Sequence, residues 1–256
     1  MSEPKIKTPL PETISGNISG LIDGSQVSAN VGDILLNVAR EHGFRIPTLC
    51  YHPGLTSDGN CRLCLVEVND RLVSSCLYPL RTPGFEVKTN SPRLKRSREL
   101  VITLMLSRAP KSKVVLSLAE EFNLKPDPRL ARTKEDQCLR CGLCVRACQA
   151  GGAEAISLVG RGSERKVCGP FFEPPIDCVG CLACAKVCPT SVIDFIEQRD
   201  YRAIWERHFP LVSCPICSRP FATQEELARP NADQICPSCR RRAMAQALYD
   251  VDYLRR

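Results

Sequence analysis

Two copies of one cysteine run constrain the fold of this chain more than any other feature. The first reads CLRCGLCVRAC and the second CVGCLACAKVC, both with the spacing C-x2-C-x2-C-x3-C. In such runs three cysteines hold one [4Fe–4S] cube and the fourth ligates the other cube. The sequence therefore predicts two clusters with exchanged ligands: a first held by Cys138, Cys141, Cys144 and Cys188, and a second held by Cys178, Cys181, Cys184 and Cys148.

The chain has 17 cysteines in 256 residues, too many for core filling alone. Such a content indicates either disulfides in a secreted protein or thiolate ligands in a reducing compartment. C-x-x-C pairs recur seven times, which favours metal ligands, and the N-terminal segment lacks the apolar core of a secretory signal. The longest aliphatic run, LVITLML at 100–106, is far shorter than the roughly 20 residues that span a bilayer. We expect a cytoplasmic protein with reduced cysteines and no membrane span.

The formal charge of +7 does not indicate a nucleic-acid-binding surface. Residues 81–113 hold nine cationic and two acidic side chains, so this segment accounts for the whole excess. Each four-thiolate iron–sulfur cluster adds roughly −2, which that count ignores. Aromatic residues, which stack on bases, make up only 5% of the chain. The basic segment is interpreted as a patch that faces either an acidic partner or solvent.

A second set of cysteines precedes the duplicated runs. Cys50, Cys61, Cys64 and Cys76 have the spacing C-x10-C-x2-C-x11-C, with a glycine-bearing loop between the first two. A loop of this kind that wraps a metal, closed by a distant fourth ligand, is typical of a [2Fe–2S] site. Zinc remains the alternative for these four cysteines. A hairpin at Asp23-Gly24 and a helix over residues 33–43 come before them, and this context favours iron.

A third set lies near the end of the chain. Cys214 and Cys217 form one C-P-x-C knuckle, and Cys236 and Cys239 form another. Paired knuckles predict a tetrahedral site of a zinc ribbon or of a rubredoxin-like iron centre, and zinc is favoured because the segment between them lacks rubredoxin aromatics. Cys168 has no partner at ligand spacing and is interpreted as a plain thiol. His52 either donates a hydrogen bond toward the nearby [2Fe–2S] site or is an ordinary imidazole.

These patterns predict an α+β chain of several parts. We expect a flexible leader at 1–17, a [2Fe–2S] domain at 18–90, a helical spacer and linker at 91–136, and a 2[4Fe–4S] ferredoxin domain at 137–200. A cysteine module with a C-terminal helix is expected at 201–256. Further strands are expected at CLVEVNDRLVSSC and FEVKT.

Residues 18–198 resemble a known family. The stretch RIPTLCYHPGL, followed by GNCRLCLVEV, is similar to the β-grasp [2Fe–2S] domain of several oxidoreductases. These are the large iron–sulfur subunit of complex I, the small diaphorase subunit of NAD-reducing hydrogenases, and iron-only hydrogenases. The two-cluster segment resembles a bacterial-type ferredoxin, and the order of the domains matches as well. In that family the spacer usually carries one histidine and three cysteines for a further [4Fe–4S] cluster. The corresponding residues here cannot ligate iron: Ala109, Lys113, Leu116 and Phe122.

The resemblance implies an electron-transfer subunit of a multisubunit oxidoreductase without catalytic residues of its own. Its partners would be a flavin/NAD-binding subunit and a catalytic subunit, with a nickel–iron hydrogenase favoured. A formate dehydrogenase, a complex I-like assembly and an electron-bifurcating complex are alternatives. A zinc-ribbon interaction or nucleic-acid-binding protein is the alternative from another class. The expected cofactors are one [2Fe–2S] cluster, two [4Fe–4S] clusters and one zinc or iron ion.

Overall fold

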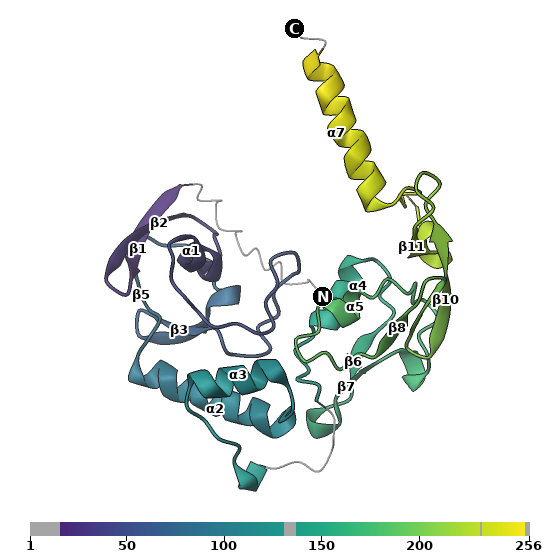
Figure 1. Ribbon diagram of the computed structural model, residues 1–256. Helices are drawn as coiled ribbons and strands as arrows, with labels where there is room; N and C mark the ends of the chain where they lie inside the picture. Colours follow the sequence, from purple (N-terminus) through teal and green to yellow (C-terminus); the bar gives the residue numbers. More distant parts are fainter. Residues whose placement is uncertain (1–15, 131–136, 231, 254–256) are drawn as a thin grey trace, which may run out of the picture. The chain divides into compact units, whose positions relative to one another are not determined.

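The computed structural model describes residues 16–130, 137–230 and 232–253, which form two compact units (Figure 1). The N-terminal unit contains the described residues up to His52, Ser57–Ser107 and the described residues from Val115 to Leu130. The C-terminal unit contains Pro53–Thr56, Arg108–Val114 and the described residues from Gln137 onward. The predicted leader, except residues 16 and 17, and the end of the predicted linker lie outside the described residues.

A five-stranded sheet with one helix forms the body of the N-terminal unit. The strand order is β2-β1-β5-β3-β4, with β1 and β5 parallel at the centre and the other neighbours antiparallel. A mixed sheet of this order, with a helix between its second and third strands, has the β-grasp arrangement. The elements are β1 Asn17–Ile22, β2 Ser25–Asn30, α1 Leu35–Glu41, β3 Leu65–Val68, β4 Arg71–Ser74 and β5 Phe85–Lys88.

Turn residues and alternating burial explain why these strands form. Asp23 and Gly24 have φ angles of 46° and 81°, as a tight two-residue hairpin turn requires. Asn69 and Asp70 do the same between β3 and β4, with φ angles of 48° and 61°. In β1 every second residue points into the core, and α1 covers it with four buried side chains, Leu35, Leu36, Val38 and Ala39. The expected hairpins and helix are therefore confirmed.

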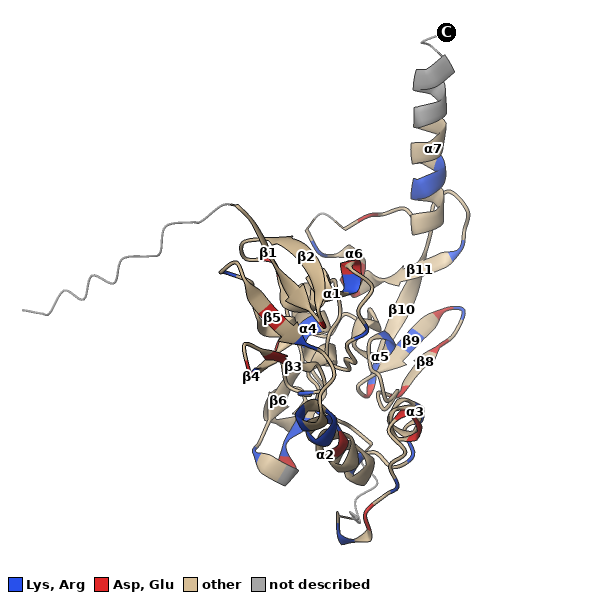
Figure 2. Ribbon diagram, turned by 90° about the vertical axis from the view of Figure 1, so that its left-hand side faces the viewer, with Lys and Arg blue, Asp and Glu red and all other residues tan. Residues whose placement is uncertain are grey.

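Two helices, of which all but Arg108, Lys113 and Val114 belong to the N-terminal unit, follow the sheet. α2 spans Pro92–Arg108 and α3 spans Lys113–Glu121, as the helical pattern predicts. Ser91 caps α2, because its Oγ accepts a hydrogen bond from the Leu94 N–H at 3.1 Å. Cationic residues of the basic segment cluster in the first half of α2 (Figure 2). Arg98 on this helix does not belong to a solvent-exposed face, because it is only 6% exposed.

The C-terminal unit begins with two short helices that repeat one backbone conformation. α4 spans Leu143–Ala150 and α5 spans Ala183–Lys186. The residues before Cys141 and Cys181, Arg140 and Gly180, both have a positive φ, of 55° and 69°. The residues after them, Gly142 and Leu182, are both left-handed as well. The duplication in the sequence is therefore also a duplication in the path of the chain.

A hairpin and a four-stranded sheet surround these helices. The hairpin consists of β6 Ser157–Val159 and β7 Lys166–Cys168, and the sheet order is β11-β10-β9-β8. Its strands are β8 Phe195–Glu197, β9 Tyr201–Ile204, β10 Arg207–Ser213 and β11 Pro220–Thr223. The sheet thus contains residues from both sides of position 200. Short 3-10 turns span Ser75–Leu77, Pro128–Leu130, Gly162–Glu164 and Pro170–Phe172.

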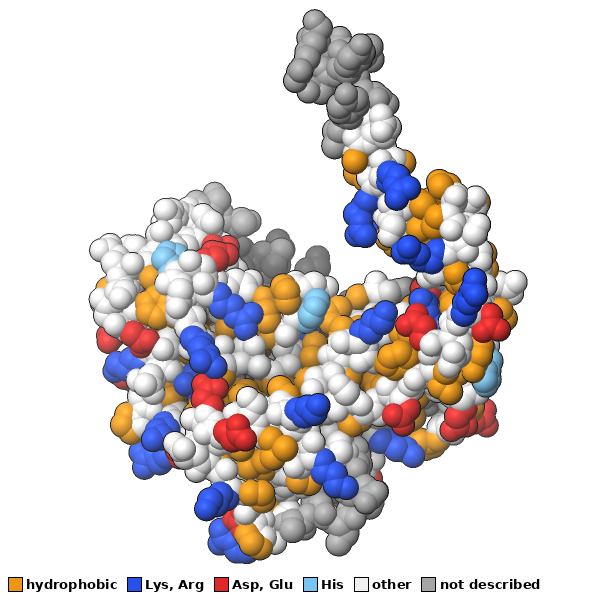
Figure 3. Space-filling view, viewed as in Figure 1, with side chains coloured by type: hydrophobic (Ala, Val, Ile, Leu, Met, Phe, Trp, Pro, Cys, Tyr) orange, Lys and Arg blue, Asp and Glu red, His pale blue; other side chains and the backbone are white. Residues whose placement is uncertain are grey.

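The chain ends in two helices, α6 Gln224–Leu227 and α7 Pro237–Tyr253. Thr223 and Glu226 form a capping box at the start of α6. Arg241 and Arg242 on α7 are exposed, and cationic side chains cover its first turns (Figure 3). Among the described residues, no helix combines the length and the apolar character that a bilayer span requires.

Candidate metal centres

The first candidate centre lies in the N-terminal unit, where two pairs of cysteines meet. Cys50, Cys64 and Cys76 are at most 2% exposed and Cys61 is half-buried. The Sγ atoms of Cys64 and Cys76 lie 3.3 Å apart, and the Cys61 N–H donates to the Cys50 Sγ at 3.5 Å. The first pair therefore lies near the β3–β4 hairpin, and the second pair closes the loop after α1.

Hydrogen bonding favours the ligand form of two of these thiols. A hydrogen bond with Cys50 lowers the pKa of Cys61 to about 6, against the opposing effect of burial. A hydrogen bond with Cys76 lowers the pKa of Cys64 to about 6 in the same way. The same contact raises the pKa of Cys76. Because thiolates are the metal-binding form, the set is suited to a cationic iron core, which would stabilise all four as anions.

Two cavities in the C-terminal unit are each lined by four cysteines. One, of about 360 Å³, is lined by three cysteines of the first run and one of the second, Cys138, Cys141, Cys144 and Cys188. The other is lined by three of the second run and one of the first, Cys178, Cys181, Cys184 and Cys148. The structure thus brings together the two groups that the sequence predicts, and their role as ligands stays a prediction.

Burial makes these sites unfavourable for thiolates without a metal. It raises the pKa of Cys141 to about 11 and that of Cys144 to about 12. It also raises the pKa of Cys184 to about 11. Backbone N–H groups bind two other sulfur atoms of these sites, since Arg140 donates to the Cys138 Sγ at 3.4 Å and Ala155 to the Cys148 Sγ at 3.3 Å. Such N–H···S bonds tune the potentials of iron–sulfur clusters.

The second of these cavities is supported by residues that the sequence does not reveal. Phe209 on β10 is fully buried, and a Cβ at Gly180 would lie 2.6 Å from its Cγ. Thr223 donates from its Oγ1 to the Val179 carbonyl at 2.5 Å. The segment between Cys178 and Cys181 therefore packs directly on the C-terminal sheet. The glycine before Cys181 is the only signal of this close approach in the sequence.

The third candidate centre is formed by Cys214, Cys217, Cys236 and Cys239. Their Sγ atoms all lie within 4.8 Å of one another, and those of Cys217 and Cys236 are 3.7 Å apart. A tetrahedral ion with metal–sulfur bonds of about 2.3 Å places its sulfur atoms about 3.8 Å apart. A backbone hydrogen bond from Cys236 lowers the pKa of Cys214 to about 6. The geometry fits one four-coordinate ion.

The other residues named in the sequence analysis belong to none of the three cysteine groups. Of the spacer residues, Ala109 is buried, Lys113 begins α3, Leu116 is 39% exposed and Phe122 is half-buried. Cys168 ends β7, opposite Ser157, and lines neither cysteine cavity. His52 is exposed, and its hydrogen bond toward a cluster stays a prediction.

Comparisons with known proteins define the class. Residues 16–92 match the family model of the 2Fe-2S iron-sulfur cluster binding domain, and residues 131–197 match that of the 4Fe-4S dicluster domain. Together the two models cover more than half of the chain. It is therefore an iron–sulfur protein that joins one domain of each kind.

The relatives are components of large oxidoreductases. The chain is 30% identical over 200 residues to the NADH-ubiquinone oxidoreductase 78 kDa subunit of Neurospora crassa, covering 67% of this chain and 27% of that protein. It is 30% identical over 195 residues to the mitochondrial NADH dehydrogenase (ubiquinone) iron-sulfur protein 1 of Solanum tuberosum, covering 66% of this chain and 26% of that protein. The chain thus spans about a quarter of the length of the curated relatives that it matches.

A solved structure is similar over a larger share of its length. A chain in the crystal structure of NAD+-reducing [NiFe]-hydrogenase in the H2-reduced state has 28% sequence identity and a TM-score of 0.54. The similarity covers 60% of this chain and 75% of that chain. The resemblance that the sequence motifs indicate is thereby confirmed.

Proposed function

We propose that this chain is an electron-transfer subunit of a multisubunit oxidoreductase. The observation that carries the proposal is the presence of two cavities, each lined by four cysteines from both duplicated runs. We assign one [4Fe–4S] cluster to each cavity and one [2Fe–2S] cluster to Cys50, Cys61, Cys64 and Cys76. When bound, such clusters accept and release single electrons. The chain's residues hold them, exclude water with buried aliphatic neighbours and set their potentials by N–H···S hydrogen bonds.

The partners that we propose are a flavin/NAD-binding subunit and a nickel–iron hydrogenase subunit, in a cytoplasmic hetero-oligomer. The similarity to a chain from an NAD+-reducing [NiFe]-hydrogenase supports this choice, because it covers 75% of that chain. The complex I relatives are matched over only about a quarter of their length. A complex I-like assembly, a formate dehydrogenase and an electron-bifurcating complex remain the alternatives.

An exposed apolar loop in the C-terminal unit supports association with a partner. Phe171 is 90% exposed, Ile176 81% and Phe172 60%. Arg207 orders the end of this loop, since its Nη1 donates to the carbonyls of Pro175 at 2.7 Å and Cys178 at 2.9 Å. Side chains of this kind are typical anchors of protein interfaces. Because Cys178 lies two residues after Ile176, a partner docked here would lie close to the second cluster.

For the third centre we propose a structural zinc ion. The four Sγ atoms fit a closed tetrahedral site, and no open coordination position is needed for catalysis. This site would brace β10 against α7 rather than carry electrons. A rubredoxin-like iron would occupy the same ligands, so only metal analysis separates the two.

The test is purification of the intact complex from its host under anaerobic conditions. We expect the chain to copurify with a flavoprotein and a hydrogenase subunit, and dithionite to produce signals of reduced [2Fe–2S] and [4Fe–4S] clusters in electron paramagnetic resonance. A colourless chain without iron would contradict the proposal and would favour the zinc-ribbon interaction or nucleic-acid-binding alternative. Copurification with a different catalytic subunit would replace the hydrogenase while leaving electron transfer intact.

A further inference from the structure

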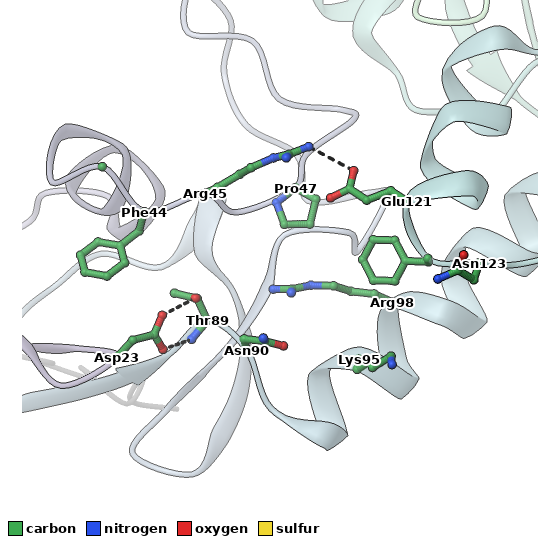
Figure 4. A pocket seen from close by; sticks show the side chains of 12 residues that line it. Asp23, Phe44, Arg45, Pro47, Thr89, Asn90, Lys95, Arg98, Glu121 and Asn123 are labelled. Atoms are coloured by element: carbon green, nitrogen blue, oxygen red, sulfur yellow. Dashed lines mark hydrogen bonds and ion pairs between the residues drawn. The ribbon is translucent and has the colours of Figure 1, made fainter.

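A cavity of about 650 Å³ in the N-terminal unit is lined by none of the seventeen cysteines. It lies among the turn after β1, the loop after α1, the end of β5, the start of α2 and the end of α3 (Figure 4). Its volume falls within the range of pockets that hold small molecules, about 300–1,000 Å³. Its polar lining includes Asn90, Lys95, Arg98 and Asn123.

Arg98 is the unusual member of this lining. It is only 6% exposed, and its side chain extends from α2 into the pocket (Figure 4). Its Nη2 donates to the Leu65 carbonyl at 2.7 Å, while its Nε is buried and has no hydrogen-bond partner among the described residues. A buried donor on a charged group that lacks an acceptor is costly, and such groups in native proteins call for an explanation. An anion bound in the pocket would lie beside this buried positive charge and stabilise it.

The acidic side chains around the pocket do not fill this role. Asp23 accepts hydrogen bonds from the backbone N–H of Thr89 at 2.7 Å and from its Oγ1 at 2.5 Å. Glu121 pairs with Arg45 at 3.1 Å. Both carboxylates attract Arg98 electrostatically, but neither accepts a hydrogen bond from it among the described residues. Lys95 makes no ion pair among the described residues, so two cationic donors remain for a ligand.

We propose that this pocket binds a small organic anion through a carboxylate or phosphate group, held by Arg98 and Lys95. Charge-assisted hydrogen bonds to a guanidinium and an ammonium are the strong kind that anion sites use. The side-chain amides of Asn90 and Asn123 add donors and acceptors for the rest of the molecule. The volume exceeds what a bare phosphate or acetate ion would fill.

The position of Arg98 couples this site to the proposed [2Fe–2S] cluster, and this step rests on the proposed function. Leu65, whose carbonyl Arg98 holds, directly follows Cys64. A nearby cation stabilises the reduced cluster, which carries one more negative charge than the oxidised form. A bound anion would offset that cation and lower the reduction potential of the [2Fe–2S] cluster.

Isothermal titration calorimetry on the full-length, cluster-loaded chain tests the site. The probes are citrate and adenosine monophosphate, titrated separately at constant ionic strength, so that the carboxylate and phosphate arms are distinguished. We expect at least one probe to bind, and Lys95→Gln and Arg98→Met to weaken that binding about tenfold or more. Lys88→Gln is the matched control, because Lys88 is exposed in the same unit and does not line the pocket.

Binding of neither probe, or equal binding by Lys95→Gln and Lys88→Gln, would overturn the site. Lys95 is exposed, so this comparison holds even where Arg98→Met impairs folding. For the coupling, the midpoint potential of the [2Fe–2S] cluster is measured by a redox titration with and without the bound probe. A lower potential in the parent chain, and a smaller shift in Lys95→Gln at the same subsaturating probe concentration, support the coupling. An unchanged potential of the parent chain with the pocket filled overturns it. Calorimetry requires no electron transfer, so failure of the proposed function would be seen separately, as missing iron.

Discussion

Cys188 lines the same cavity as Cys138, although the two residues belong to different cysteine runs. The converse holds in the other cavity, where Cys148 of the first run meets Cys178 of the second. Cys148 lies on α4 and Cys188 follows α5, so each helix region contributes to both cavities. Neither cavity can therefore be completed by one run alone, which makes the two proposed clusters depend on each other for folding.

Replacing Cys148 with serine is expected to damage the cluster of the other run. The remaining three residues of that site are Cys178, Cys181 and Cys184, so its electron paramagnetic resonance signal should change and its iron content fall. The cluster assigned to Cys138, Cys141, Cys144 and Cys188 should keep its signal. Cys168→Ser is the control, because Cys168 lines neither cavity. Selective loss of the first cluster's signal instead would refute the exchanged ligands.

Much of the fold could be predicted because its determinants are local. Asp23-Gly24 and Asn69-Asp70 favour tight turns by their own conformational preferences, and the strands on either side follow from them. The cysteine runs are equally explicit, since ligand spacing is fixed by the geometry of a cube. The groups that the sequence predicts for the two cavities are the groups that line them.

The other features of the fold depend on contacts between residues that lie far apart in the sequence, and such contacts cannot be predicted from a single sequence. Arg98 belongs to a run of cations that is typical of a solvated face, yet its side chain is buried. Phe209 and Gly180 lie in different predicted domains, and apart from the glycine itself nothing in either segment indicates that they touch. Likewise, β8 pairs with β9 across the expected boundary at residue 200, because strand pairing follows hydrogen bonding rather than composition.

Gly180→Ala adds only one methyl group, yet it is expected to lower both the stability of the chain and the occupancy of the second cluster. The residue has a φ of +69°, and an added Cβ would lie 2.6 Å from the Phe209 Cγ. Positive φ alone costs a non-glycine residue roughly 1–2 kcal/mol, and crowding in a packed core adds about 1–3 kcal/mol. Thermal unfolding and iron content are the measurements. Gly24→Ala is the control, since it has a φ of +81° with nothing within 4 Å. Equal effects of both changes would show that the contact with Phe209 is unimportant.

Metal analysis is expected to give about ten irons and one zinc per chain, the sum for one [2Fe–2S] cluster, two [4Fe–4S] clusters and a zinc site. Cys217→Ser should lower zinc while iron stays constant, because Cys217 belongs only to the third centre. About eleven irons without zinc would indicate iron in that centre. About fourteen would indicate a spacer cluster whose ligands are not Ala109, Lys113, Leu116 and Phe122.

The double change Phe171→Ser and Ile176→Ser is expected to weaken association with the catalytic or flavin partner while leaving the chain folded. These side chains are 90% and 81% exposed, so their loss removes little buried area within the chain. A hot-spot anchor contributes about 2 kcal/mol or more, so the loss of even one anchor predicts binding weaker by about thirtyfold. Size-exclusion chromatography of the reconstituted complex measures the effect, with iron content as the check on folding. Leu104→Ser, which also removes an exposed apolar side chain, is the matched control. If the loop variant assembles as well as the control, the partner docks elsewhere on the chain.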